Sequence, residues 1–121
     1  MRWAIIGALL SLFIGGSAWL YLSQRAIYAH PEKLVGQQVW ICGYIQDTFE
    51  SREIWLTPWD YRNNGLGLGF ISDQVAPNKA EGPLHQKTTC IRATIIRTGC
   101  AKELICMWSQ FEYAARRVKP N

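Results

Sequence analysis

The sequence has few of the groups from which an enzyme or a metal site is built. It contains two histidines, His30 beside a proline and His85 in a polar segment. Neither the G-x-S-x-G nor the H-E-x-x-H signature of hydrolases occurs. A solvated loop histidine and a turn-forming Asp60 are the simplest interpretations; a metal or pocket shared by His85 and Asp60 is the alternative. We therefore expect no catalytic residues, no metal and no cofactor.

Charge is also missing from the start of the chain. Residues 3–22, WAIIGALLSLFIGGSAWLYL, carry no charged side chain, and a run of roughly 20 apolar residues can span a bilayer as a helix. Basic Arg2 and the small residues at 16–18 would also fit a cleavable secretory signal. The run continues through Trp19 and Tyr21, aromatic residues that suit a membrane interface, so we favour an uncleaved anchor.

Both interpretations place the rest of the chain outside the cytoplasm. We expect a single-pass protein of a bacterial inner membrane with its C-terminal domain in the periplasm, and contact with the membrane through residues 3–22. The alternative is a secreted or periplasmic protein after signal cleavage. In chain order we expect an anchor or signal at 1–24, a linker and first turn at 25–38, a barrel at 39–115 and a basic tail at 116–121.

If the domain is exported, its four cysteines are expected to form disulfides, because an even number of cysteines in a small exported domain indicates disulfide bonds. We favour a long-range Cys42–Cys90 bond and a short Cys100–Cys106 bond. A zinc site is the alternative, but no two cysteines are as closely spaced as in the usual C-x-x-C pairs.

Charge is nearly balanced elsewhere. The chain has 13 Lys and Arg and 9 Asp and Glu, with a formal net charge of +4, and Arg2 and Arg25 flank the apolar run. A domain with nearly balanced charge does not have the strongly basic surface that is typical of nucleic-acid-binding proteins. We interpret Arg116, Arg117 and Lys119 as a solvated tail; contact with lipid headgroups or an acidic partner is the alternative.

Alternation of apolar and polar residues predicts an all-β fold. One helical turn is expected from Pro31 to Gly36, and a loop at 59–64. In the first strand, aliphatic residues face one side and Trp40, Cys42 and Tyr44 the other. Five strands with a long third connection predict a small antiparallel OB-like barrel after the N-terminal helix, its first strand paired with its fourth. The expected strands are 39–45, 53–57, 66–71, 88–98 and 105–113.

The glycine-rich stretch NNGLGLGF, residues 63–70, does not match a nucleotide-binding loop. Its G-x-G-x-G spacing is followed by neither an amphipathic helix nor Gly-Lys-Ser/Thr. We predict a curved strand with Leu66, Leu68 and Phe70 inward and a bare glycine face outward. A shallow groove for a flat ligand or a peptide backbone is the alternative.

Residues 30–61 contain the run P-E-K-x-x-G-x-x-V-x-I-x-G-Y-I, then Phe49-Glu50, an Ile-Trp-Leu strand and Asp60-Tyr61. In these positions the chain resembles a poorly characterised group of small bacterial OB-like proteins. The resemblance implies an OB-like fold and brings no catalytic residue with it.

Aromatic residues are the best candidates for binding. Most should be core, but those on the outer face of the first two strands could stack bases or sugars or anchor a protein. We expect a membrane-tethered, envelope-exposed, non-enzymatic OB-like module that contacts another protein, with oligomeric state open. The alternative is an oligosaccharide- or oligonucleotide-binding module, with nucleic acid disfavoured by the near-neutral domain. The candidate binding residues are Trp40, Tyr44, Trp55, Trp59 and Tyr61.

Overall fold

A computed structural model describes residues 18–48, 51–72, 81–98 and 111–119 of the chain. Residues 18–29 are helical and are called the N-terminal helix below. The elements that follow are η1 (Pro31–Lys33), β1 (Gln38–Asp47), β2 (Arg52–Trp55), α2 (Pro58–Asn63), β3 (Gly67–Ile71), β4 (Lys87–Arg97) and β5 (Tyr113–Arg117).

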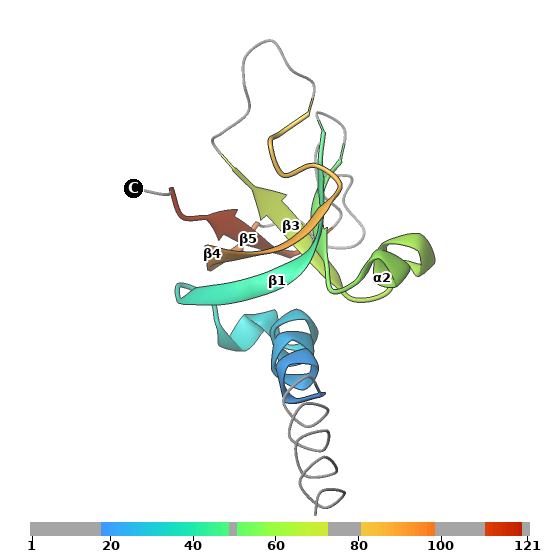
Figure 1. Cartoon of the computed structure of the whole chain (residues 1–121). Coiled ribbons are helices and arrows are strands. Elements are labelled where there is room, and N and C mark those ends of the chain that lie inside the picture. The colour runs from blue at the N-terminus through green and yellow to red at the C-terminus, as the bar shows by residue number, and fades with distance from the viewer. Residues whose placement is uncertain (1–17, 49–50, 73–80, 99–110, 120–121) are drawn as a thin grey trace, which may run out of the picture.

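The five strands form one closed barrel in the order β1-β2-β3-β5-β4 (Figure 1). The chain is mostly β, which confirms the expected five-stranded barrel and the pairing of the first strand with the fourth, and it is consistent with an OB-like arrangement. The expectation that all strands are antiparallel was wrong, because β3 and β5 are parallel. A closed ring with an odd number of strands cannot alternate direction throughout, so one pair must be parallel.

Two expected elements differ most from the structure. Residues 59–64, expected as loop, lie mostly in α2, because Thr57 caps a helix that Pro58 can begin. The fifth strand was expected at 105–113, but β5 begins at Tyr113; residues 105–110 lie outside the described part. Because β5 continues through Arg117, Arg116 and Arg117 belong to a barrel strand and not to the expected basic tail, whereas Lys119 lies beyond β5.

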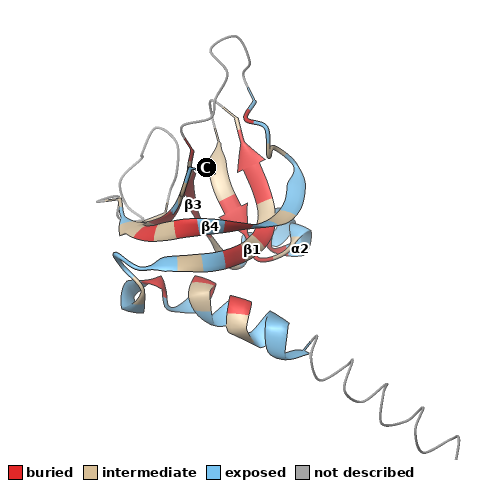
Figure 2. Ribbon diagram, turned by 60° about the vertical axis from the view of Figure 1, so that its left-hand side comes forward, coloured by how far each residue is buried: buried red, intermediate tan, exposed pale blue. Residues whose placement is uncertain are grey.

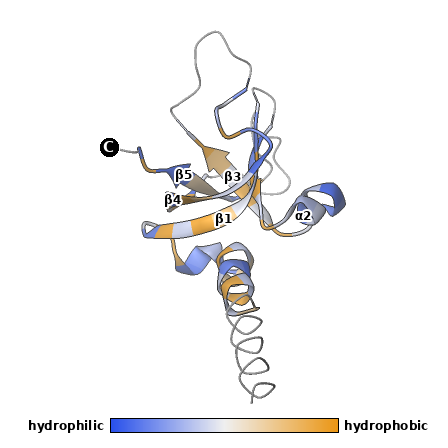
Figure 3. Ribbon diagram, in the orientation of Figure 1, coloured by the Kyte–Doolittle hydropathy of each residue, from blue (hydrophilic) through white to orange (hydrophobic). Residues whose placement is uncertain are grey.

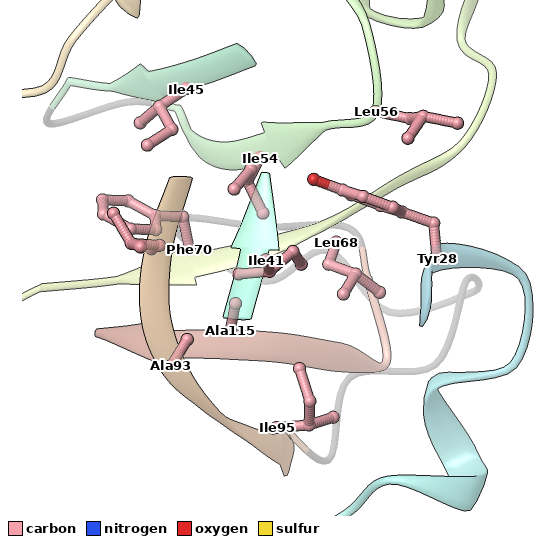
Figure 4. Close-up of a cluster of buried hydrophobic side chains, with 11 residues drawn as sticks. Tyr28, Ile41, Ile45, Ile54, Leu56, Leu68, Phe70, Ala93, Ile95 and Ala115 are labelled. Carbon is pink, nitrogen blue, oxygen red and sulfur yellow. The ribbon is translucent and has the colours of Figure 1, made fainter. Parts of the chain in front are cut away.

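The barrel interior is filled by alternate aliphatic residues from all the strands. Ile41, Ile45 and Ile54 are fully buried, as the period-two pattern predicts. Leu68 and Phe70 of β3 also point inward, which confirms the direction predicted for these two residues of the glycine-rich stretch. Tyr28, from the N-terminal helix, places its ring in the same cluster (Figure 4). The helix thus covers one end of the barrel core.

The N-terminal helix is part of the folded unit. Burial alternates along it, with Gln24 and Tyr28 buried on the side that faces the barrel (Figure 2). The expected linker at 25–38 therefore begins inside a helix, which continues to residue 29 and is followed by the turn that starts at Pro31. Gly36 adopts a φ of 85°, which favours glycine and ends that turn as expected.

The expected membrane segment, residues 3–22, lies mostly outside the described residues. Within the part that is described, no helix is long and apolar enough to cross a membrane. The side chains of residues 19–22 are exposed around the helix, and this end of it is hydrophobic (Figure 3).

Cys42 and Cys90 are direct partners across β1 and β4 and form a disulfide. This confirms the favoured long-range pairing. The two bonded residues are 48 positions apart in the sequence, so the bond closes a long loop. The predicted Cys100–Cys106 bond lies outside the described residues.

Candidate functional site

Aromatic side chains from distant parts of the chain meet on the outer face of β1, β2 and β3. Tyr44 and Trp55 are cross-strand partners. The ring of Tyr61, on α2, lies 5.4 Å from Tyr44 and 6.0 Å from Trp55, and Phe111 lies 5.3 Å from Trp55 on another side. The tilted and edge-on geometries are those that aromatic pairs prefer. We call these four residues the outer aromatic cluster.

The glycine strand lies beneath this cluster. Gly67 is the cross-strand partner of Trp55, and a Cβ placed on Gly67 would lie 2.6 Å from Trp55 Cε3. The expected bare glycine face was therefore wrong, because the Trp55 indole covers it. Glycine is needed here so that the large ring can lie against the backbone.

The outer aromatic cluster is largely closed to ligands. Trp55 is only 3% exposed, because Tyr61 and Phe111 pack against it. Strands 2 and 3 are the face with which OB-folds bind oligonucleotides and oligosaccharides. In this chain the side chains of its own α2 and of residue 111 occupy part of that face.

The short helix α2 is held firmly by Asp60. Thr57 accepts a hydrogen bond of 3.1 Å from the Asp60 N–H and donates its hydroxyl to Asp60 Oδ2 at 2.6 Å. Asp60 Oδ1 accepts from the N–H of Leu66 at 3.1 Å, and a Cβ at Gly65 would collide with the Asp60 carboxylate. Asp60 therefore joins α2 to β3, a positioning role that the sequence analysis did not assign.

Trp59 projects from this fixed helix into solvent. Its side chain is 64% exposed, and the neighbouring Tyr61 is 41% exposed. Tyr61 is thus shared between the cluster and the surface. Among the candidate binding residues, Trp59 and Tyr61 are the two on α2, two positions apart, and both remain accessible.

Trp40 lies apart from the others. It is 59% exposed and stands four residues before Tyr44 on β1, roughly 13 Å along the strand. Its cross-strand partner is Arg92 on β4. The accessible predicted binding residues therefore fall on two surfaces, Trp40 on β1 and Trp59 with Tyr61 on α2, whereas Trp55 is buried.

The titratable residues considered for catalysis take part in separate networks. His85 Nδ1 accepts a hydrogen bond of 2.9 Å from the N–H of Asp47, whereas Asp60 bonds to Thr57 and Leu66. Burial raises the pKa of the Asp47 carboxyl, and Arg52 and His85 oppose that shift. His85 thus holds the chain before β4 against β1, which is a structural role.

A groove of about 600 Å³ runs beside the cluster. It is bounded by the end of the N-terminal helix, the start of β3 and the start of β5, and Tyr28, Gly65 and Phe111 are among its lining residues. A groove at the glycines was the alternative prediction, and its second wall is formed by the N-terminal helix, which is distant from the glycines in sequence. Its lining mixes apolar rings with Glu32 and Glu112 and indicates no single ligand chemistry.

Comparisons of this chain with family models, curated proteins and solved structures found no match. The resemblance of residues 30–61 to small OB-like proteins remains a prediction from the sequence. Function is accordingly inferred from the described side chains and their surroundings.

Proposed function

We propose that this chain is a membrane-tethered, envelope-exposed OB-like module that binds another protein through Trp59 and Tyr61 and catalyses no reaction. The strand order, with β1 between β2 and β4 and β3 beside β5, supports the OB-like assignment. In this proposal the barrel is a scaffold, and α2 is the element that presents the contact residues.

The observation that carries the proposal is the exposure of Trp59 on a fixed helix. A tryptophan that is 64% exposed leaves a large apolar area in water. Such residues are enriched among the few that dominate protein–protein affinity. Because the Thr57–Asp60–Leu66 hydrogen bonds already order α2, a partner loses little affinity to ordering this segment.

Two observations on the same segment support the tether. Residues 3–22 form an uncharged apolar run of sufficient length. Residues 19–22 of the N-terminal helix are exposed on all sides, and a helix that is hydrophobic all round is typical of one that lies in a membrane or against another protein.

Binding of an oligosaccharide or oligonucleotide is less well supported. That function would need rings free to stack on the outer face of the barrel. Trp55, the central ring there, is 3% exposed and is packed against Tyr61 and Phe111.

Affinity capture from detergent-solubilised envelope membranes tests the proposal. The full chain, a Trp59→Ala variant and a Trp40→Ala variant are used as baits, since Trp40 is a tryptophan of similar exposure on another surface. We expect one protein to be enriched by the wild type and Trp40→Ala and lost with Trp59→Ala. Equal capture by all three baits would contradict a contact through α2.

A further inference from the structure

The surface around Trp40 is a second candidate site. A groove of about 350 Å³ lies on the outside of the barrel, where β1, β4 and the end of β5 meet. Trp40 and Arg92 are cross-strand partners there, and the backbone N–H of Val118 donates to the carbonyl of Arg92 at 3.0 Å. The last described residues are thereby held along β4. The lining consists of Trp40, Cys90, Ile91, Arg92, Arg117, Val118 and Lys119.

Two exposed arginines lie on the outer side of this surface, Arg92 of β4 and Arg116 of β5. Arg116 pairs with Thr94, which lies two positions after Arg92 on the same face of β4. None of the described residues that line the groove is acidic. An exposed tryptophan beside arginines suits a ligand that offers negative charge above an apolar layer.

The groove is also close to the proposed membrane anchor. Gln24 Nε2 donates to the backbone carbonyl of Trp40 at 3.0 Å. Leu22 and Trp19 precede Gln24 by two and five residues, or roughly 3 and 8 Å along the helix axis. If the apolar run ends at the bilayer surface, Trp40 lies at the depth where aromatic residues favour the headgroup region.

We propose that the outer face that carries Trp40, Arg92 and Arg116 rests on the anionic headgroups of the membrane. The inference builds on the tether in the proposed function and adds an orientation to it. Trp40 enters the interface, and the guanidinium of Arg92 meets lipid phosphate. In Figure 1, α2 and the C-terminal end of the described chain lie on opposite sides of the barrel, so Trp59 remains open to a partner.

Hydroxyl-radical footprinting of the full chain tests this orientation, because mass spectrometry reads each tryptophan separately. The chain is compared in detergent, in nanodiscs of zwitterionic lipid and in nanodiscs containing anionic lipid. We expect oxidation of Trp40 to slow several-fold in anionic nanodiscs, and that of Trp59, which is similarly exposed, to stay at its detergent rate. Arg92→Glu should remove much of the protection, whereas the same charge change at exposed Arg62 of α2 should not.

The outcomes separate the two proposals. A chain that inserts into nanodiscs but shows Trp40 oxidised at the detergent rate would overturn the orientation and leave the tether standing. A chain that does not associate with lipid would overturn both. Protection of Trp40 that needs added envelope protein and not anionic lipid would assign this face to an acidic protein and overturn the inference. A low oxidation rate at Trp55, which is 3% exposed in the folded chain, reports that each variant remains folded.

Discussion

Gln24 and Cys42 are joined by a hydrogen bond of 2.8 Å, from the backbone N–H of Cys42 to the side-chain carbonyl of Gln24. The amide of Gln24 also donates to the carbonyl of Trp40. β1 pairs with β4 from Gln38 onward but with β2 only from Tyr44 onward. One glutamine therefore occupies a strand edge that the barrel leaves open, and it fixes the helix to the barrel.

Replacing Gln24 with alanine should destabilise the barrel by about 1–3 kcal/mol, because the Cys42 N–H and the Trp40 carbonyl lose their partner. Urea unfolding of the full chain in mild detergent, followed by tryptophan fluorescence, measures the change. Gln38→Ala, an exposed glutamine at the start of β1, should change stability by less than about 0.5 kcal/mol. Equal effects of the two substitutions would contradict the proposed role of Gln24.

Gly67→Ala should cost about 1–3 kcal/mol, because the added methyl would overlap the six-membered ring of Trp55. Trp55→Phe makes room, so the same glycine substitution should cost less in that background. The double-mutant cycle should give a coupling of about 0.5–3 kcal/mol. Additive effects of the two changes would show that the indole does not limit the space at Gly67.

Removal of the Cys42–Cys90 disulfide by a double alanine substitution should lower stability by about 2–4 kcal/mol, since the bond closes a long loop. Thermal unfolding of both proteins tests the stability change. Non-reducing peptide mapping of the wild type should recover a Cys42–Cys90 linked peptide. Recovery of Cys42 joined to Cys100 or Cys106 would contradict the pairing.

Asp47 should make stability depend on pH. Burial raises the pKa of its carboxyl, so the folded chain binds this proton more tightly than the unfolded chain does. Stability should therefore fall as the pH rises from the unfolded pKa, roughly 4, through the higher folded pKa.

Asp47→Asn should flatten that fall, measured as the free energy of unfolding from pH 4 upward. Burial also raises the pKa of Glu53, so some slope should remain in the variant. Glu81→Gln, which removes an exposed carboxylate, should keep the wild-type slope. A slope for Asp47→Asn that matches the wild type would overturn the assignment to Asp47.

Local patterns in the sequence were sufficient to predict much of the barrel. The period of two placed Ile41 and Ile45 inside and Trp40 outside, because side chains alternate along a strand whatever its neighbours are. The same alternation brought Cys42 within reach of Cys90 once the first strand was paired with the fourth. These predictions needed only the alternation of side chains along a strand and the pairing of the first strand with the fourth.

Features that depend on contacts distant in sequence could not be predicted. Gln24 and Tyr28 could not be assigned to the folded unit from the sequence, because their partners are backbone groups at the edge of β1 that β2 does not cover. The covering of Gly67 by Trp55 depends on strand register, and the packing of Phe111 on Trp55 depends on how β5 returns along β3. The helix α2 was predictable from local sequence, because Thr57-Pro58 followed by Asp60 is a helix-start signal.

Site-specific photo-crosslinking tests whether α2 is the contact surface for a protein while keeping Trp59 in place. In the full chain a photoreactive phenylalanine analogue replaces exposed Asn63, one turn after Trp59 on the same side of α2, or exposed Lys87 at the start of β4 as the control, and cells are irradiated. One discrete crosslinked protein band is expected with position 63 and none with position 87. No crosslinked protein at position 63, or the same bands from both positions, would show that α2 is not the contact surface.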